Sequence, residues 1–100
     1  MPFDPAIRQI VASFRQSPRW NETLDLRLLR AFWPKIVGES LAKSTSVAEI
    51  QGFRLIIRVP DPIWKKQLQS IRGQLLRKVN EPWPNPWIKD IGFTYEDKRN

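Results

Sequence analysis

The chain has neither cysteine nor histidine among its 100 residues. These absences exclude a disulfide framework, a thiol nucleophile, zinc sites of the Cys/His type and catalytic pairs of serine or cysteine with histidine. A chain without cysteine also fits a reducing cytoplasm. We expect neither a bound metal nor an organic cofactor.

Acidic residues are scarce: ten Asp and Glu against 17 Lys and Arg give a formal net charge of +7. Most of the carboxylates lie singly in basic surroundings, and the glycine-rich patterns that hold nucleotide phosphates are missing. The sequence therefore predicts no enzymatic activity and no small-molecule substrate. The excess of positive charge predicts attraction to polyanions such as nucleic acid.

Long hydrophobic runs are also absent, since no apolar stretch approaches the roughly 18 residues of a membrane-spanning helix. The N-terminal sequence MPFDPAIRQ has no charged region followed by an apolar one, so no secretory signal is expected. A length of 100 residues suffices for one modest hydrophobic core. We therefore expect a single domain over residues 1–100 with no membrane contact.

Helical periodicity predicts three helices, at roughly residues 5–15, 21–42 and 62–80. The first and third open on an Asp-Pro pair, in which Asp suits the N-cap and Pro suits the first helical position. The second helix is expected to kink or break just before Pro34. The core stripe of the third helix comprises Trp64, Leu68, Ile71, Leu75 and Val79.

Two strands joined by a turn at Gln51-Gly52 are expected between the second and third helices. In the second strand alternate residues face the core and an open surface. The buried set comprises Phe53, Leu55, Ile57 and Val59, and the open set comprises Arg54, Ile56 and Arg58. A last strand is expected within WIKDIGFTYE, followed by a polar, frayed tail at residues 97–100.

The resulting order of elements, α-α-β-β-α-β, predicts an α+β fold. Three strands with helices on one face make a two-layer sandwich. The first two strands form an antiparallel hairpin. The last strand returns after a helix and is expected to lie parallel to a neighbour.

Trp33 and Gly38 flank the expected kink and admit two interpretations. In the first, both serve local packing, and Gly38 allows a backbone or a bulky side chain to approach closely. In the second, Trp33 is partly exposed and contacts a partner, because Pro34 breaks the helix beside a large aromatic ring. On the second interpretation, the candidate partner-binding residues are Trp33, Lys35 and Gly38.

Basic side chains supply the candidate nucleic-acid interface. Scattered cations often form only a solvated face, but their collective excess favours weak, non-specific binding to the phosphates of DNA. Neither the aromatic sheet pattern of an RRM nor the GXXG loop of a standard KH domain is present. The candidate residues are Arg54 and Arg58 on the open strand face, Lys65, Lys66 and Arg72 on the third helix, and Lys35 and Lys43 around the kink.

A characteristic order of residues runs from the second helix into the third. It comprises Leu29, Trp33, Ile36-Val37-Gly38, Leu41-Ala42, Thr45, the hairpin, Ile63-Trp64 and Leu68. This order, over about residues 26–93, resembles the DciA family of small bacterial proteins that load or recruit the replicative helicase. Asp61 stands where the family pattern has serine, and many members carry a long basic extension outside this domain.

The resemblance implies a KH-like α+β domain without the GXXG loop. It also implies cytoplasmic action, contact with the hexameric DnaB-type helicase and some affinity for DNA. We therefore predict a non-enzymatic replication accessory protein that promotes helicase loading. Two alternatives remain: a general single-stranded nucleic-acid binder acting in RNA metabolism, and a pure protein-interaction module whose charge only keeps it soluble.

Overall fold

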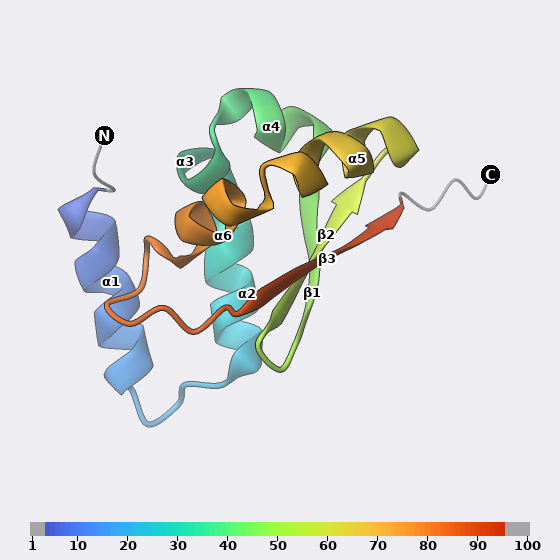
Figure 1. Ribbon diagram of the computed structural model, residues 1–100. Coiled ribbons are helices and arrows are strands. Elements are labelled where there is room, and N and C mark those ends of the chain that lie inside the picture. Colours follow the sequence, from blue (N-terminus) through green and yellow to red (C-terminus); the bar gives the residue numbers. More distant parts are fainter. Residues whose placement is uncertain (1–3, 96–100) are drawn as a thin grey trace.

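The computed structural model describes residues 4–95, which form six helices and three strands (Figure 1). The elements are α1 (Pro5–Gln16), α2 (Glu22–Ala31), α3 (Trp33–Val37), α4 (Glu39–Ser44), β1 (Ser46–Gln51), β2 (Arg54–Val59), α5 (Pro62–Ser70), α6 (Arg72–Asn80) and β3 (Asp90–Tyr95). The tail expected at residues 97–100 lies outside the described residues.

The sheet has the strand order β1-β2-β3, with β1 and β2 antiparallel and β2 and β3 parallel. The helices pack on one side of it, so the α+β class, the order of elements and the parallel last strand are confirmed. Leu55, Ile57 and Val59 of β2 point into the core as expected. Ile56 is buried too, because β2 is the central strand and has a neighbour on each side.

Pro34 divides the expected second helix where the sequence placed the break. The chain leaves the helical path at Phe32, and Pro34 lies in the first turn of the next helix, where a missing N–H costs little. A further break at Gly38 separates α3 from α4 and was not expected. Gly38 has φ of +93°, a left-handed conformation that residues other than glycine rarely adopt.

The expectation of one continuous third helix is wrong, because the chain breaks at Ile71 into α5 and α6. The hydroxyl of Ser70 donates a hydrogen bond to the carbonyl oxygen of Gln67 at 2.6 Å, a back-bond that bends helices. Gly73 adds a residue of poor helix propensity just after the break. The core stripe keeps its phase: Leu68, Leu75 and Val79 are buried, and Trp64 and Ile71 are half-buried against the same core.

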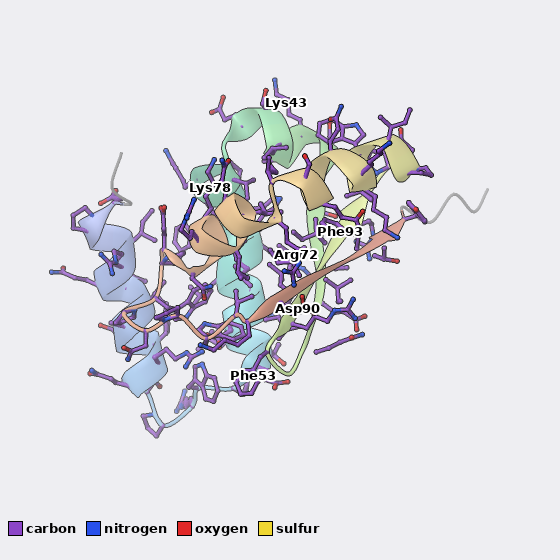
Figure 2. The ribbon with its side chains drawn as sticks, in the orientation of Figure 1. Lys43, Phe53, Arg72, Lys78, Asp90 and Phe93 are labelled. Carbon is purple, nitrogen blue, oxygen red and sulfur yellow. The ribbon has the colours of Figure 1, made fainter. Side chains whose placement is uncertain are left out.

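Phe53 does not belong to the buried face of β2, contrary to the sequence expectation. It shares the two-residue hairpin turn with Gly52, whose φ of +63° suits the first position of such a turn. The Phe53 side chain is 65% exposed at the end of the hairpin (Figure 2). The alternating pattern in the sequence runs past the start of β2 into the turn, but the strand pairing ends at Gln51 and Arg54, and Phe53 lies beyond it at the surface.

Helix α1 is fastened to the rest of the domain through Asp25 on α2, which is only 2% exposed. The guanidinium of Arg15 binds this carboxylate at 2.9 Å, and the indole Nε1–H of Trp20 donates to it at 3.1 Å. Arg15 also stacks on the rings of Trp20 and Trp87, at 4.8 and 5.2 Å. A buried carboxylate needs such partners, so this cluster fixes α1 against α2 and the segment before β3.

The side chain of Asn80 makes most of the side-chain polar contacts that hold the segment between α6 and β3. Its amide nitrogen donates to the carbonyl oxygens of Leu76 and Ile88, at 3.0 and 2.9 Å. Its amide oxygen accepts from the backbone N–H groups of Trp87 and Ile88, at 3.1 and 3.0 Å. The proline-rich loop is therefore pinned to the end of α6 before the chain enters the sheet.

Candidate nucleic-acid interface

The open face of the sheet carries Arg54 and Arg58, as the alternation in β2 predicted. Arg54 pairs with Gln51 on β1 and with Asp90 on β3, and Arg58 pairs with Ser46 and Thr94. Paired residues of neighbouring strands point to the same face, so the face is polar along both ends of β2.

Arg54 and Arg72 converge on one carboxylate, that of Asp90 at the start of β3. Figure 2 shows Arg72 and Asp90 close together. The Arg54 guanidinium lies 3.2 Å from one Asp90 oxygen, and Arg72 binds the other oxygen from α6. Gly92 allows this arrangement, since a Cβ there would lie 2.6 Å from the Arg54 guanidinium. Asp90 thus offsets one of two positive charges, and both cations are less available to phosphates than the sequence alone indicated.

Arg58 lies beside a second arginine that the sequence analysis missed, Arg30 of α2. Arg30 donates to the carbonyl oxygens of Val47 and Ala48, at 3.1 and 2.8 Å. These carbonyls flank the irregularity in the β1–β2 register, and Arg30 satisfies them where the strand pairing does not. Arg58 and Arg30 line one open cavity of about 370 Å³ together with Ser46, whose hydroxyl lies 3.5 Å from Arg58.

Lys65 and Lys66 lie on α5, in the helical layer, and not on the open face of the sheet. Lys66 is exposed, and the Lys65 ammonium lies 5.8 Å from the centre of the Tyr95 ring. Lys35 on α3 and Lys43 on α4 are exposed as well. The candidate cations therefore lie in both layers of the sandwich. Arg54 and Arg72 come together because both form ion pairs with Asp90.

Trp33 is a core residue, and the expectation that it is partly exposed at the kink is wrong. Its side chain is 5% exposed, and its indole Nε1–H donates to the Thr45 hydroxyl at 3.1 Å. That hydroxyl in turn donates to the carbonyl oxygen of Leu41 at 2.7 Å. Pro34 thus starts a new helix, and the inward-pointing Trp33 joins α3 to Thr45 at the end of α4.

Gly38 is required for its conformation and not for a close approach. A Cβ added at Gly38 would meet no atom within 4 Å, so no packed neighbour demands glycine. Its positive φ is what L side chains avoid. Of the three candidate partner-binding residues, Lys35 alone presents its side chain at the surface.

Comparison with known proteins identifies the chain. The family model described as "Dna[CI] antecedent, DciA" matches residues 6–93. The chain belongs to the DciA family. A UPF0232 protein of Bifidobacterium longum (strain NCC 2705) is 26% identical over 92 residues, which cover 91% of this chain. The chain spans 59% of the length of this curated relative.

The DciA match confirms the resemblance noted over residues 26–93 and extends it to α1, which the residues of the resemblance had left out. Within residues 4–95, no helix is long and apolar enough to cross a membrane. The same part of the chain has no group of three His, Cys, Asp or Glu side chains arranged to hold a metal ion.

Proposed function

We propose that this DciA-family protein is a non-enzymatic accessory factor of DNA replication that acts in the cytoplasm. It binds the replicative DnaB-type helicase and DNA and promotes loading of the helicase. The observation that carries the proposal is the family match over residues 6–93. The net charge of +7 supports the contact with DNA, since each phosphate neutralised by Lys or Arg releases counterions.

The contact with DNA is weak and independent of sequence, because surface cations bind phosphates and do not read base edges. Arg58, Lys65 and Lys66 contribute more to it than Arg54 and Arg72, since Asp90 is already bound to the last two. The remaining candidate phosphate contacts are Lys35 and Lys43.

The helicase contact includes the exposed surface of α3 around Lys35. Trp33 acts there from the core by holding α3 against Thr45, and Gly38 acts by setting the angle between α3 and α4. A variant of Lys35 therefore tests the contact without disturbing the fold, which a variant of Trp33 cannot do.

The test uses the purified chain and the purified DnaB-type helicase of the same organism. Unwinding of a forked duplex coated with single-strand-binding protein measures loading, and capture of the helicase by the immobilised chain measures binding. We expect capture and faster unwinding, both weakened by Lys35→Glu and unchanged by Arg19→Glu, which makes the same charge change on an exposed loop residue. Failure of both capture and stimulation would refute the proposal.

The two alternatives give different results in the same material. A general binder of single-stranded RNA would bind an RNA oligonucleotide more tightly than a DNA oligonucleotide of equal length and would leave the helicase unaffected. A pure protein-interaction module would bind neither oligonucleotide even at low salt, where phosphate contacts are strongest.

A further inference from the structure

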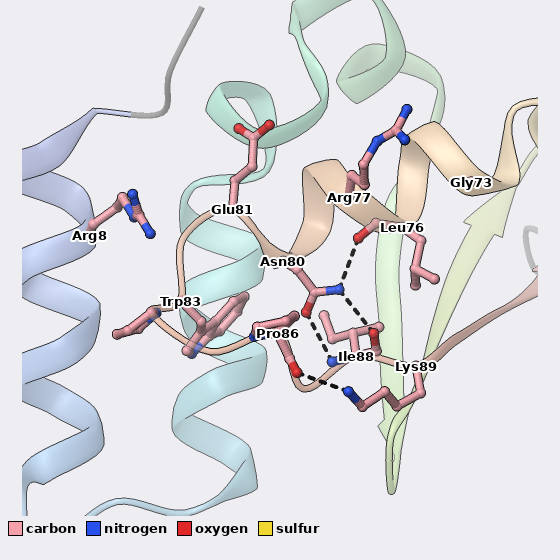
Figure 3. A pocket seen from close by; sticks show the side chains of 11 residues that line it. Arg8, Gly73, Leu76, Arg77, Asn80, Glu81, Trp83, Pro86, Ile88 and Lys89 are labelled. Atoms are coloured by element: carbon pink, nitrogen blue, oxygen red, sulfur yellow. Dashed lines mark hydrogen bonds between the residues drawn. The ribbon is translucent and has the colours of Figure 1, made fainter.

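An open hollow lies on the side of the domain between α1, α6 and the loop that leads to β3 (Figure 3). We call it the α1–α6 groove. Its volume is about 650 Å³, within the range of pockets that hold ligands or a few side chains of a partner. None of its residues belongs to the candidate nucleic-acid interface.

The groove has an apolar floor and a basic rim. Leu76, Pro84 and Pro86 give the floor its accessible apolar surface, and the buried side chains of Trp83 and Ile88 lie beneath it. The charged residues that line it are Arg8, Arg77, Lys89 and Glu81, so three cations face one carboxylate. Arg8 and Arg77 form no ion pair or hydrogen bond with another side chain of the described part, and the Lys89 ammonium donates to the carbonyl oxygen of Pro86.

The walls of the groove are fixed before anything binds. Asn80 pins the loop to α6 through three hydrogen bonds with Trp87 and Ile88, and the Trp83 and Trp87 rings meet edge to face with centres 5.2 Å apart. The Arg15 stack on Trp87 holds the same loop from α1. A preformed site loses little conformational entropy on binding, which favours a specific occupant.

We propose that the α1–α6 groove binds an acidic peptide segment of a partner protein, with an apolar side chain seated on the floor and carboxylates on the rim. An apolar centre with a polar rim is the usual anatomy of a protein interface. Single-stranded nucleic acid suits the groove less well, because Trp83 is 3% exposed and offers no ring face for base stacking. A second copy of the chain also suits it poorly, since both copies carry a net charge of +7.

Selection of random 12-residue peptides on the immobilised full chain tests this proposal. We expect the enriched peptides to be acidic and to contain leucine, isoleucine or an aromatic residue. A synthetic copy of one such peptide should bind at least tenfold more weakly to the Arg77→Glu/Lys89→Glu variant. Its affinity for Arg19→Glu/Arg27→Glu, which makes the same charge change on exposed residues outside the groove, should fall no more than about threefold, the effect of net charge alone.

Amide shifts in the NMR spectrum of the unmodified chain provide a readout independent of the variants. Titration with the same peptide should move resonances of residues 73–89 and of α1 around Arg8. Enrichment of basic or neutral peptides, equal losses in both double variants, or shifts confined to other residues would overturn the proposal. The proposal would also be overturned if a thymidine 12-mer displaced the peptide and bound more weakly to Arg77→Glu/Lys89→Glu but not to Arg19→Glu/Arg27→Glu. A negative helicase result leaves this proposal unaffected, because no helicase enters the experiment.

Discussion

At the residue scale, Trp33 is the tryptophan, among five, whose buried side chain also has a hydrogen-bond partner for its indole N–H. It combines a buried ring with a hydrogen bond to Thr45, whose hydroxyl continues the chain to the Leu41 carbonyl. The void beside it, lined also by Val37, is too small for a water molecule. A buried indole that fills its space and satisfies its N–H stabilises the fold through both contributions.

Replacing Trp33 should therefore reduce the free energy of unfolding in two separable steps. Trp33→Phe removes the hydrogen bond to Thr45 and part of the ring, and Trp33→Ala removes the whole ring at a cost of about 3–5 kcal/mol. Denaturant unfolding followed by circular dichroism measures both, with Phe53→Ala, at an aromatic residue that is 65% exposed, as the control. An unfolding midpoint for Trp33→Ala equal to that of the original chain would contradict the burial.

At the element scale, the backbone of the loop between α6 and β3 is hydrogen-bonded near Trp87 and Ile88 by a single polar side chain, that of Asn80. Loops usually owe their shape to many weak contacts, but here Asn80 satisfies backbone groups of Trp87 and Ile88 that have no strand partner. Pro84 and Pro86, one on each side of Asn85, restrict the backbone of the rest of the loop. The loop is therefore held from the end of α6, by the side chain of the last residue of that helix.

Asn80→Ala should loosen this loop more than it unfolds the domain. The change leaves the Trp87 and Ile88 amides without their acceptor, and we expect a loss of about 1–3 kcal/mol in stability. Hydrogen exchange of these two amides should accelerate strongly, while the amides of β2 keep their protection. Asn85→Ala, in the same loop but exposed, is the control. Unchanged exchange at Trp87 and Ile88 would show that Asn80 does not hold the loop.

At the scale of the whole molecule, the positions of the charged side chains, more than the net charge, decide which cations are available to a polyanion. The carboxylate of Asp90 joins a strand cation to a helix cation, Arg54 to Arg72, and so connects the two layers at the edge of the sheet. All three side chains are about half exposed, so these pairs add little to stability. Their main effect is to reduce the positive charge that Arg54 and Arg72 present to a polyanion.

Asp90→Asn should consequently raise the affinity for DNA. The substitution removes one negative charge and releases Arg54 and Arg72 for phosphates, so the plot of log K against log salt should become steeper by about one to two phosphate contacts. Fluorescence anisotropy with a labelled DNA oligonucleotide at several salt concentrations measures this. Glu39→Gln, at an exposed residue of α4, makes the same charge change elsewhere. Equal gains from Asp90→Asn and Glu39→Gln would show that net charge alone decides.

The sequence by itself determined the features that depend on neighbours along the chain. The Asp-Pro helix starts are confirmed, since Asp4 and Asp61 each cap a helix through a side-chain hydrogen bond. The break before Pro34, the alternation within β2 and the residues of the family resemblance are also local in origin. Apolar spacing and proline chemistry act over a few residues, so these signals survive without knowledge of the fold.

Tertiary structure decided which residues that are distant in the sequence come into contact. The buried indole of Trp33 finds the acceptor for its N–H on Thr45, twelve residues away, and Phe53 stays exposed in the turn of the hairpin. The capture of Arg54 and Arg72 by Asp90, the placement of Arg30 at the strand irregularity and the α1–α6 groove join segments far apart in the chain. No local pattern encodes such contacts, because packing of the whole domain sets which distant side chains meet.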